Sequence, residues 1–170
     1  MKPNLLAAIM IAVGAFILSA SSLVYLYKNF QPVQVLAESE YFDPNSTLPV
    51  KITINNVGIN VPVKVAPNYQ FSDNEAIFIK STQDIGGGNS VIYAHNWDKL
   101  FGKLKKVKIN DDITINLANG KQVNYRVDQI HTVPADTINI LKPTTNSYLT
   151  LFTCTGFLDK DRLVVVASQI

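Results

Sequence analysis

The chain contains a single cysteine, Cys154, and the residues around it could support nucleophilic chemistry. An alternating run at residues 149–153 precedes the cysteine and is typical of a β-strand. A polar segment at 155–161 follows it, and Arg162 then begins a second apolar run, residues 163–167. A strand that ends at a thiol, followed by a turn that returns an arginine, can place a nucleophile beside a cation. We therefore treat this segment as the candidate active site, for which the rest of the chain must supply a base.

Cysteine catalysis needs a thiolate, a proton donor for the leaving amine, and a cation or amide donors for the oxyanion. The only histidines are His95 and His131. His95 ends a predicted strand and precedes Asn96, which makes a polar corner where an active site can open. His131 lies inside a long predicted strand, where a packing or solvent-facing role is expected. We therefore favour His95 as the proton donor.

Two arginines, Arg126 and Arg162, lie outside the N-terminal region. Arg126 falls in the middle of a predicted strand, whereas Arg162 comes just after the loop that follows the cysteine. Because arginine stays charged throughout, Arg162 suits an oxyanion or a substrate carbonyl. Spacing alone leaves a second interpretation open, since a lone cysteine is more often a small core residue and a lone histidine on a strand is usually structural.

The N-terminal region predicts a membrane anchor over residues 1–28. Residues 5–27 carry no charge and are mostly Leu, Ile, Ala, Val and Phe. About 22 residues at ~1.5 Å each make a helix of ~33 Å, which is enough to cross a bilayer core. Tyr25 and Tyr27 lie at the outer end, where aromatic rings favour the headgroup region.

A cleaved signal peptide is the alternative, because small residues at 19–21 offer a cleavage site. The apolar run is longer than the usual ~7–15-residue core of such a peptide, which favours an uncleaved anchor. One lysine on each side, Lys2 and Lys28, gives a weak orientation signal, and the free amino terminus favours an N-terminus inside the cell.

The rest of the sequence is predicted to form a stalk followed by one domain. Residues 29–47 are polar and contain Pro32 and Pro44, as in a linker, and residues 48–170 have the size of a single domain with one core. A formal net charge of +2 is too small to suggest nucleic-acid binding. One cysteine outside the anchor cannot form an internal disulfide.

The sequence of the domain predicts an all-β fold, either a barrel or a sandwich. Short runs of alternating apolar and polar residues are separated by turn signals. Residues 97–107 show apolar spacings of three and four, which predict a short helical segment. Residues 134–147 form a loop long enough to suspect function. The apolar side chains of this loop are expected to pack against another apolar surface. The predicted strands cover residues 50–54, 59–65, 76–80, 90–94, 113–117, 122–133, 149–153 and 163–167.

The sequence Thr-Leu-Phe-Thr-Cys at 150–154 resembles the T-L-x-T-C motif of sortases, with Arg162 at that family's arginine position. Ala94 replaces the glycine often found before the family's histidine. Asn110 replaces the glycine of a G-D turn, where asparagine tolerates the left-handed conformation. The resemblance covers residues 48–170. Its other segments are 51–54 with 57–59 as the first hairpin, 91–96 as the strand that ends in the histidine, and 100–104 with 110–113.

The resemblance implies a closed β-barrel with short helices, preceded by one transmembrane helix, and a membrane-anchored cysteine transpeptidase. By that likeness, Cys154 attacks the Thr–Gly carbonyl of an LPxTG-like sorting signal. His95 protonates the departing amine, and Arg162 steadies the substrate backbone and the oxyanion. An amine from a cell-wall precursor or a pilin lysine then resolves the thioacyl-enzyme. Thr153 and Ala94 would line the substrate groove.

The resemblance also implies the cellular setting. We expect a single-pass protein of the cell membrane with its catalytic domain outside the cell. Its partners would be sorting-signal proteins, an amine acceptor and the membrane, but no nucleic acid. No cofactor is expected. Some sortases bind calcium through loop carboxylates, but the acids here are scattered and form no clear motif: Glu75, Asp84, Asp98, Asp111 and Asp112.

Two alternatives to the transpeptidase stay open from the sequence. One is a thiol peptidase that hydrolyses similar peptides, since it needs the same three residues. The other is an anchored domain that only binds a partner and leaves its thiol unused.

Overall fold

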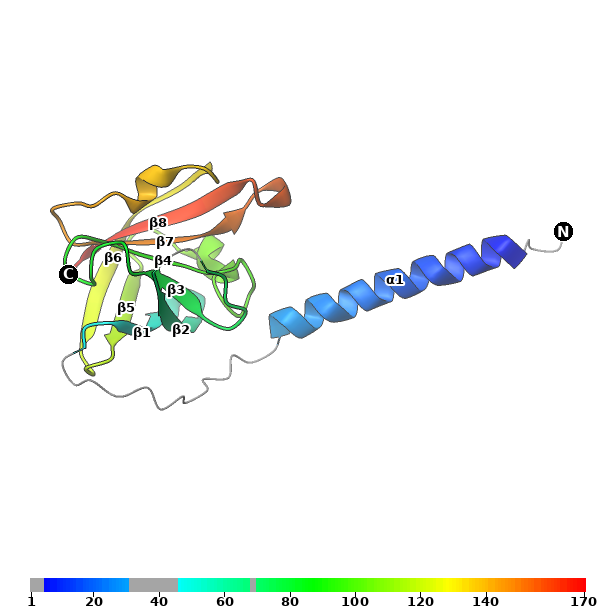
Figure 1. The fold of residues 1–170 in the computed structure, drawn as a ribbon, viewed down its shortest axis with the longest axis horizontal. Helices are drawn as coiled ribbons and strands as arrows, with labels where there is room; N and C mark the ends of the chain where they lie inside the picture. Colours follow the sequence, from blue (N-terminus) through cyan, green and yellow to red (C-terminus); the bar gives the residue numbers. More distant parts are fainter. Residues whose placement is uncertain (1–4, 31–45, 68–69) are drawn as a thin grey trace. The chain divides into compact units, whose positions relative to one another are not determined.

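The computed structural model describes residues 5–30, 46–67 and 70–170, which divide into two compact units (Figure 1). The first contains the helix α1 (Leu5–Phe30), and the second contains all the described strands. None of the helices in these ranges combines the length and the apolar character that a membrane crossing needs. The anchor expected over residues 1–28 includes four residues outside the described ranges and stays a prediction. The stalk, 29–47, lies largely outside them.

Eight strands in the described part of the second unit close into a barrel with the order β1-β2-β3-β4-β7-β8-β6-β5. This confirms the all-β fold that the strand pattern predicted and the closed barrel that the family resemblance implied. β1 runs antiparallel to β2 and β5, whereas β3 lies parallel to β2, and β7 lies parallel to β4. The strands are β1 (Pro49–Ile54), β2 (Ile59–Ala66), β3 (Ala76–Ile79), β4 (Asn89–Tyr93), β5 (Asp112–Leu117), β6 (Gln122–Pro134), β7 (Tyr148–Thr155) and β8 (Asp161–Gln169).

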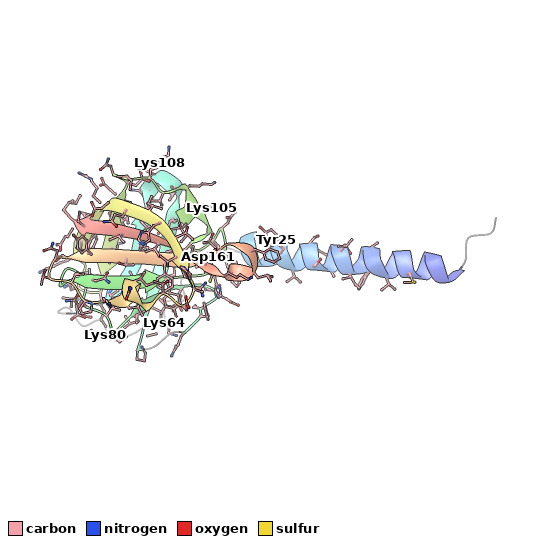
Figure 2. The ribbon with its side chains drawn as sticks, turned by 90° about the horizontal axis from the view of Figure 1, so that it is seen from above. Tyr25, Lys64, Lys80, Lys105, Lys108 and Asp161 are labelled. Carbon is pink, nitrogen blue, oxygen red and sulfur yellow. The ribbon has the colours of Figure 1, made fainter. Side chains whose placement is uncertain are left out.

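Alternation along the strands builds the barrel core. Ile52 and Ile54 of β1 and Ile113 and Ile115 of β5 have no exposed surface, while their neighbours in sequence are at least partly exposed. This is the period-two pattern of a strand with one face in a core. Lys105 is among the exposed lysines at the barrel surface (Figure 2).

A second apolar cluster covers the outer face of β4, β7 and β8, the face turned away from the barrel core. Tyr93, Phe152 and Val164 are buried there, and Ile140 and Leu141 pack against them. These last two residues belong to η3 (Ile138–Leu141), a short 3₁₀ helix in the loop between β6 and β7. Figure 1 shows this segment over the β7–β8 side of the barrel. The loop therefore folds over an apolar surface, as expected.

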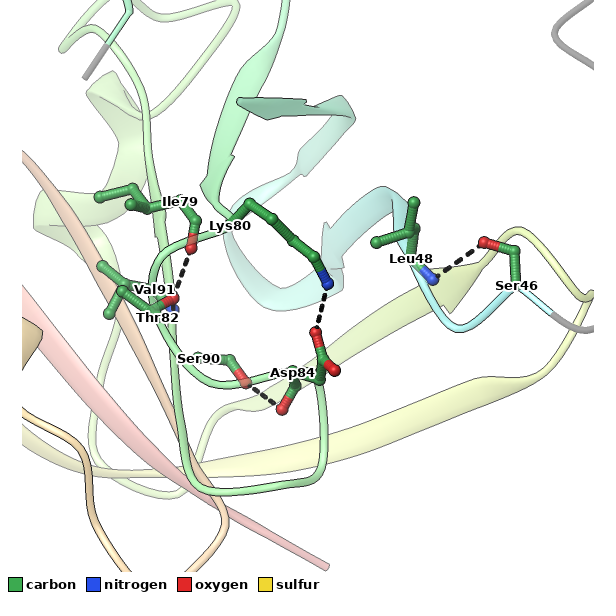
Figure 3. Close-up of polar contacts among 8 residues, drawn as sticks. All are labelled: Ser46, Leu48, Ile79, Lys80, Thr82, Asp84, Ser90 and Val91. Atoms are coloured by element: carbon green, nitrogen blue, oxygen red, sulfur yellow. Dashed lines mark hydrogen bonds and ion pairs between the residues drawn. The ribbon is translucent and has the colours of Figure 1, made fainter. Parts of the chain in front are cut away.

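The connection from β3 to β4 fixes where β4 begins (Figure 3). Thr82 Oγ1 donates to the Ile79 carbonyl at 2.6 Å and accepts the Val91 N–H at 3.3 Å. Ser90 Oγ donates to the Asp84 carbonyl at 2.8 Å. These bonds tie the loop to both strands, and so hold β4, which leads into His95, in one register.

The segment at 97–107 is not the regular helix that its apolar spacing suggested. It is a series of turns followed by the 3₁₀ helix η2 (Gly102–Lys106). The Phe101 N–H donates to the His95 carbonyl at 3.0 Å, and the Gly102 N–H donates to the Trp97 carbonyl at 2.8 Å. The segment at 101–102 thus folds back on the residues that follow β4. These backbone hydrogen bonds take the place of the regular hydrogen bonds of an α-helix.

Gly102 makes the close approach possible. A Cβ at this position would lie 2.6 Å from the Asn96 carbonyl oxygen and 2.7 Å from the Trp97 carbonyl carbon. Asn110, which stands where the family resemblance has glycine, has φ 72. The left-handed conformation expected of this asparagine is therefore present.

We predict that Gly102→Ala lowers the free energy of unfolding by about 1–3 kcal/mol, the usual cost of overpacking. Its methyl group would collide with backbone that packs directly beside His95. Gly87→Ala is the matched control, because its Cβ would lie 3.3 Å from the nearest atom, the Asp84 carbonyl oxygen. Thermal and urea unfolding measure both variants. Equal losses in the two would contradict this role of Gly102.

Candidate active site

Cys154 lies near the end of β7 and is partly buried. In the antiparallel ladder between β7 and β8, its direct partner is Arg162. Side chains of directly opposed residues point to the same face, with Cβ atoms about 4.5–5.5 Å apart. The turn after the thiol therefore returns the arginine beside it, as the sequence pattern indicated.

His95 reaches the same place from the other side of β7. β4 runs parallel to β7, with Tyr93 opposite Phe152, and the Ala94 N–H donates to the Phe152 carbonyl at 3.4 Å. His95 and Cys154 each lie two residues beyond that pair, so they occupy matching positions on the outer face. The strand order β4-β7-β8 thus brings histidine, cysteine and arginine to one end of three neighbouring strands.

The Arg162 guanidinium is held by the loop that precedes it. Its Nη1 donates to the Asp159 and Asp161 carbonyls, both at 2.9 Å. Leu158 and Asp159 have φ 55 and φ 57, in the left-handed region that residues other than glycine rarely adopt. Such strain persists where the surroundings fix the backbone, and it is common beside functional groups. Here the strained backbone orients the Asp159 carbonyl toward Arg162.

Opposing effects act on the Cys154 thiol. Burial raises its pKa, the Arg162 charge lowers it, and the Asp159 carboxylate raises it further. The net shift is upward, so the thiol form dominates at neutral pH in the absence of substrate. A nucleophilic role for this thiol would therefore require a neighbouring base to take its proton.

The imidazole of His95 lies between two aromatic rings. Phe71 stacks on it with a centroid distance of 4.8 Å and an interplanar angle of 24°. Trp97 stacks on it at 4.4 Å and 8°. Sequence reasoning assigned neither ring to the site. Trp97 could have been noticed from its place two residues after the histidine, but Phe71 lies in another loop and carries no local signal.

Thr153 and Ala94, predicted to line the groove, are buried, with 4% and 5% of their surface exposed. Thr153 Oγ1 donates to the Ala94 carbonyl at 2.8 Å, which ties the cysteine strand to the histidine strand. This contact is structural, and substrate binding by these residues stays a prediction. Because side chains alternate along a strand, Thr153 points to the face opposite Cys154.

The alternative residues do not adjoin Cys154, although His131 lines the cavity described below. Arg126 forms an ion pair with Asp112, Nε to Oδ1 2.9 Å, on β6 and β5. His131 lies on β6, opposite Val164 of β8. Neither is adjacent to Cys154 in the barrel ladders. Among the described residues, no group of three or more His, Cys, Asp or Glu side chains could hold a metal ion.

A cavity of about 510 Å³ lies on the same outer face as Cys154. Its floor includes Thr150 of β7 and its ladder partner Val166 of β8. Thr150 and Cys154 share a face, since they are four positions apart along the strand and side chains alternate with a period of two. The loop at 135–147 contributes Thr137 and Ile140 to the lining. We call this cavity the groove. His95, Cys154 and Arg162 do not line it, and the buried Phe152 lies between Thr150 and Cys154 on the same face.

The electrostatic environment of the thiol predicts opposite effects for two substitutions. Arg162→Gln removes the charge that lowers the Cys154 pKa, so the pKa should rise and alkylation at pH 7 should slow. Asp159→Asn removes a charge that raises the pKa, so the pKa should fall and alkylation should speed up. Asparagine also tolerates the left-handed backbone found at this position.

Iodoacetamide alkylation rates measured from pH 6 to 10 give the thiol pKa of each variant. Shifts of the same sign in both variants would contradict this account of the thiol.

Comparisons with known proteins agree with this geometry. The Sortase domain family model matches residues 52–170. Sortase A of Listeria monocytogenes is similar at 26% identity and TM-score 0.64, covering 72% of this chain and 87% of that chain. Sortase C1 of Streptococcus suis is similar at 29% identity and TM-score 0.63, covering 72% of each chain.

A sortase D5 transpeptidase of Clostridium perfringens shares the fold at 21% identity and TM-score 0.65, covering 74% of this chain and 81% of that chain. No curated protein matches the chain in sequence. The family model nevertheless spans well over half of the chain, including the strands that carry His95, Cys154 and Arg162. On this evidence the chain belongs to the sortase family.

Proposed function

We propose that the protein is a cysteine transpeptidase that cleaves an LPxTG-like sorting signal and joins the released carboxyl end to an amine acceptor. Membership in the sortase family supports transpeptidase chemistry in general. The observation that carries the proposal is the order β4-β7-β8, which brings His95, Cys154 and Arg162 together at one end of three neighbouring strands.

The first step is attack by Cys154 Sγ on the carbonyl carbon between threonine and glycine of the signal. His95 accepts the thiol proton, which is needed because burial raises the thiol pKa. The carbonyl oxygen becomes an oxyanion, and Arg162 supplies a cation there. Arginine has five N–H donors. Since the described protein acceptors engage only Nη1, the donors on Nε and Nη2 can serve the substrate.

The second step breaks the peptide bond. His95 passes its proton to the departing glycine amine, and the acyl part stays on sulfur as a thioester. The acceptor amine then attacks the thioester, gives its proton to His95, and releases the thiolate. His95 then returns that proton to the Cys154 thiolate, which restores the starting state of the enzyme. The product is a new amide bond.

The groove offers a binding surface for an extended peptide. Val133 and Val164 give it apolar lining, which suits leucine and proline side chains. The Thr150 hydroxyl also lines it and donates its proton to Asn89 Oδ1. An amine outcompetes water only if it is held close while solvent is excluded. The loop at 135–147, packed over the outer cluster, is placed to limit solvent. The acceptor in this proposal is a cell-wall precursor or a pilin lysine.

We further propose that residues 1–28 anchor the protein in the cell membrane as a single pass, with the N-terminus inside and the barrel outside. The uncharged apolar run at 5–27 supports this part of the proposal. The reaction as written uses no cofactor.

The transpeptidase is tested by incubating residues 46–170 with a fluorescent LPxTG-type peptide panel, with and without triglycine or a lysine amine. The expected product carries the amine, and Cys154→Ala should lower kcat/KM about 10³-fold or more. Arg162→Gln should lower it about 10²–10³-fold, as for other oxyanion donors. Arg126→Gln is the matched control and should retain activity, because this arginine pairs with Asp112 away from the site.

Two outcomes would contradict the proposal. Hydrolysis alone, despite abundant amine, would identify a thiol peptidase instead of a transferase. Full function of Cys154→Ala in binding a sorting-signal peptide, with no turnover by the wild type, would identify a binding domain.

The anchor is tested by fractionating cells that express the full chain or a form without residues 1–28. We expect the full chain in the membrane fraction, resistant to extraction with carbonate, and the shortened form in the soluble fraction. Recovery of the full chain as a soluble protein of reduced mass would instead indicate a cleaved signal peptide.

A further inference from the structure

Five rings form a continuous series that begins on the outer face of β4 and β7 and ends at Trp97, which packs against the barrel core. Phe152 stacks on Tyr93 with centroids 5.2 Å apart and planes at 12°. Tyr93 meets Phe71 edge-to-face at 6.0 Å and 88°. Phe71 in turn stacks on His95, and His95 stacks on Trp97. The series therefore joins the cysteine strand, the histidine strand and the loop before β3.

The rings of Phe71 and Trp97 cover opposite faces of the His95 imidazole. Their centroids lie 4.8 and 4.4 Å from it, both in stacked geometry. Two rings cannot occupy the same face at these distances without overlapping. We call this pair the aromatic clamp. It blocks rotation of the imidazole about its own bond to Cβ, while the edge that carries the nitrogens stays approachable.

Phe71 is held in place through its neighbour. The Tyr93 hydroxyl accepts the Gln70 N–H at 2.6 Å and also donates to the Gln70 carbonyl. One side chain of β4 thus fixes both backbone groups of the residue before Phe71. Phe71 itself keeps 62% of its surface exposed. Burial in a core therefore does not explain its position, whereas the edge contact with Tyr93 and the stacking on His95 do.

We propose that Phe71, fixed by Tyr93, is a positioning residue that holds the imidazole of His95 in the plane needed for proton transfer. This inference rests on the proposed transpeptidase function. Proton transfer requires the donor and the acceptor within hydrogen-bond reach in the correct orientation. A ring free to rotate spends less time in that orientation. Removing one side of the clamp should therefore lower kcat and leave substrate affinity nearly unchanged.

The experiment compares four variants in the peptide-plus-amine assay. Phe71→Leu removes the ring but keeps an apolar side chain, and Phe71→Tyr restores a ring. Tyr93→Phe removes only the hydroxyl that fixes Gln70. Tyr125→Phe is the control, because it removes a hydroxyl that accepts the Gly86 N–H at 3.0 Å elsewhere in the barrel.

We expect Phe71→Leu to lower kcat about tenfold with less than about a twofold change in KM, since small misplacements of catalytic groups are costly. Phe71→Tyr should stay within about twofold of wild type, and Tyr93→Phe should fall between them. Tyr125→Phe should keep the wild-type kcat. In NMR spectra, the His95 ring protons should move downfield in Phe71→Leu, because a stacked ring no longer shields them.

Wild-type kcat in Phe71→Leu would overturn the inference and leave the proposed function standing. The inference is also overturned if Phe71→Tyr loses as much activity as Phe71→Leu, or if the His95 resonances do not move. If the wild-type domain turns over no peptide with any amine, the proposed function fails, and this inference fails with it. Thermal unfolding of each variant separates these results from loss of the fold.

Discussion

The register of three neighbouring strands is the constraint on which the candidate site depends. β7 pairs in parallel with β4 on one side and antiparallel with β8 on the other. Each ladder fixes which residues lie opposite each other. β4 therefore places His95 on one side of Cys154, and β8 places Arg162 on the other side. A one-residue slip in either ladder would turn a partner to the opposite face. The barrel, which closes every edge, secures that register.

Opposing effects act on the pKa of the Cys154 thiol. Burial disfavours the thiolate, and Arg162 offsets part of that effect, while Asp159 opposes the arginine. A thiol that stays protonated until a base acts on it is protected from indiscriminate alkylation and oxidation, since the thiolate is the reactive form. The histidine therefore has to be well placed. The aromatic clamp and the bond from Phe101 to the His95 carbonyl both act on that placement.

Local patterns in the sequence were sufficient to predict the strands, an all-β fold and the three residues that the ladders bring together. The choice of a closed barrel over a sandwich came from the family resemblance. Strong alternation marks β1 and β5, and the motif around Cys154 marks β7. The contact between Phe71 and His95 could not be predicted, because it depends on where a loop before β3 crosses β4. The turns at 97–101 were also missed. Apolar spacing there matches a helix, and only the close approach at Gly102 shows why the backbone departs from one.

Mass spectrometry of the intact domain during turnover tests the central claim most directly, that Cys154 carries an acyl intermediate. Incubation of residues 46–170 with an LPxTG-type peptide, quenched in acid, should show a mass increase equal to the peptide up to its threonine. The adduct should map to Cys154, and added triglycine should discharge it into an amide product. Absence of the adduct during turnover, or its persistence in Cys154→Ala, would contradict the account.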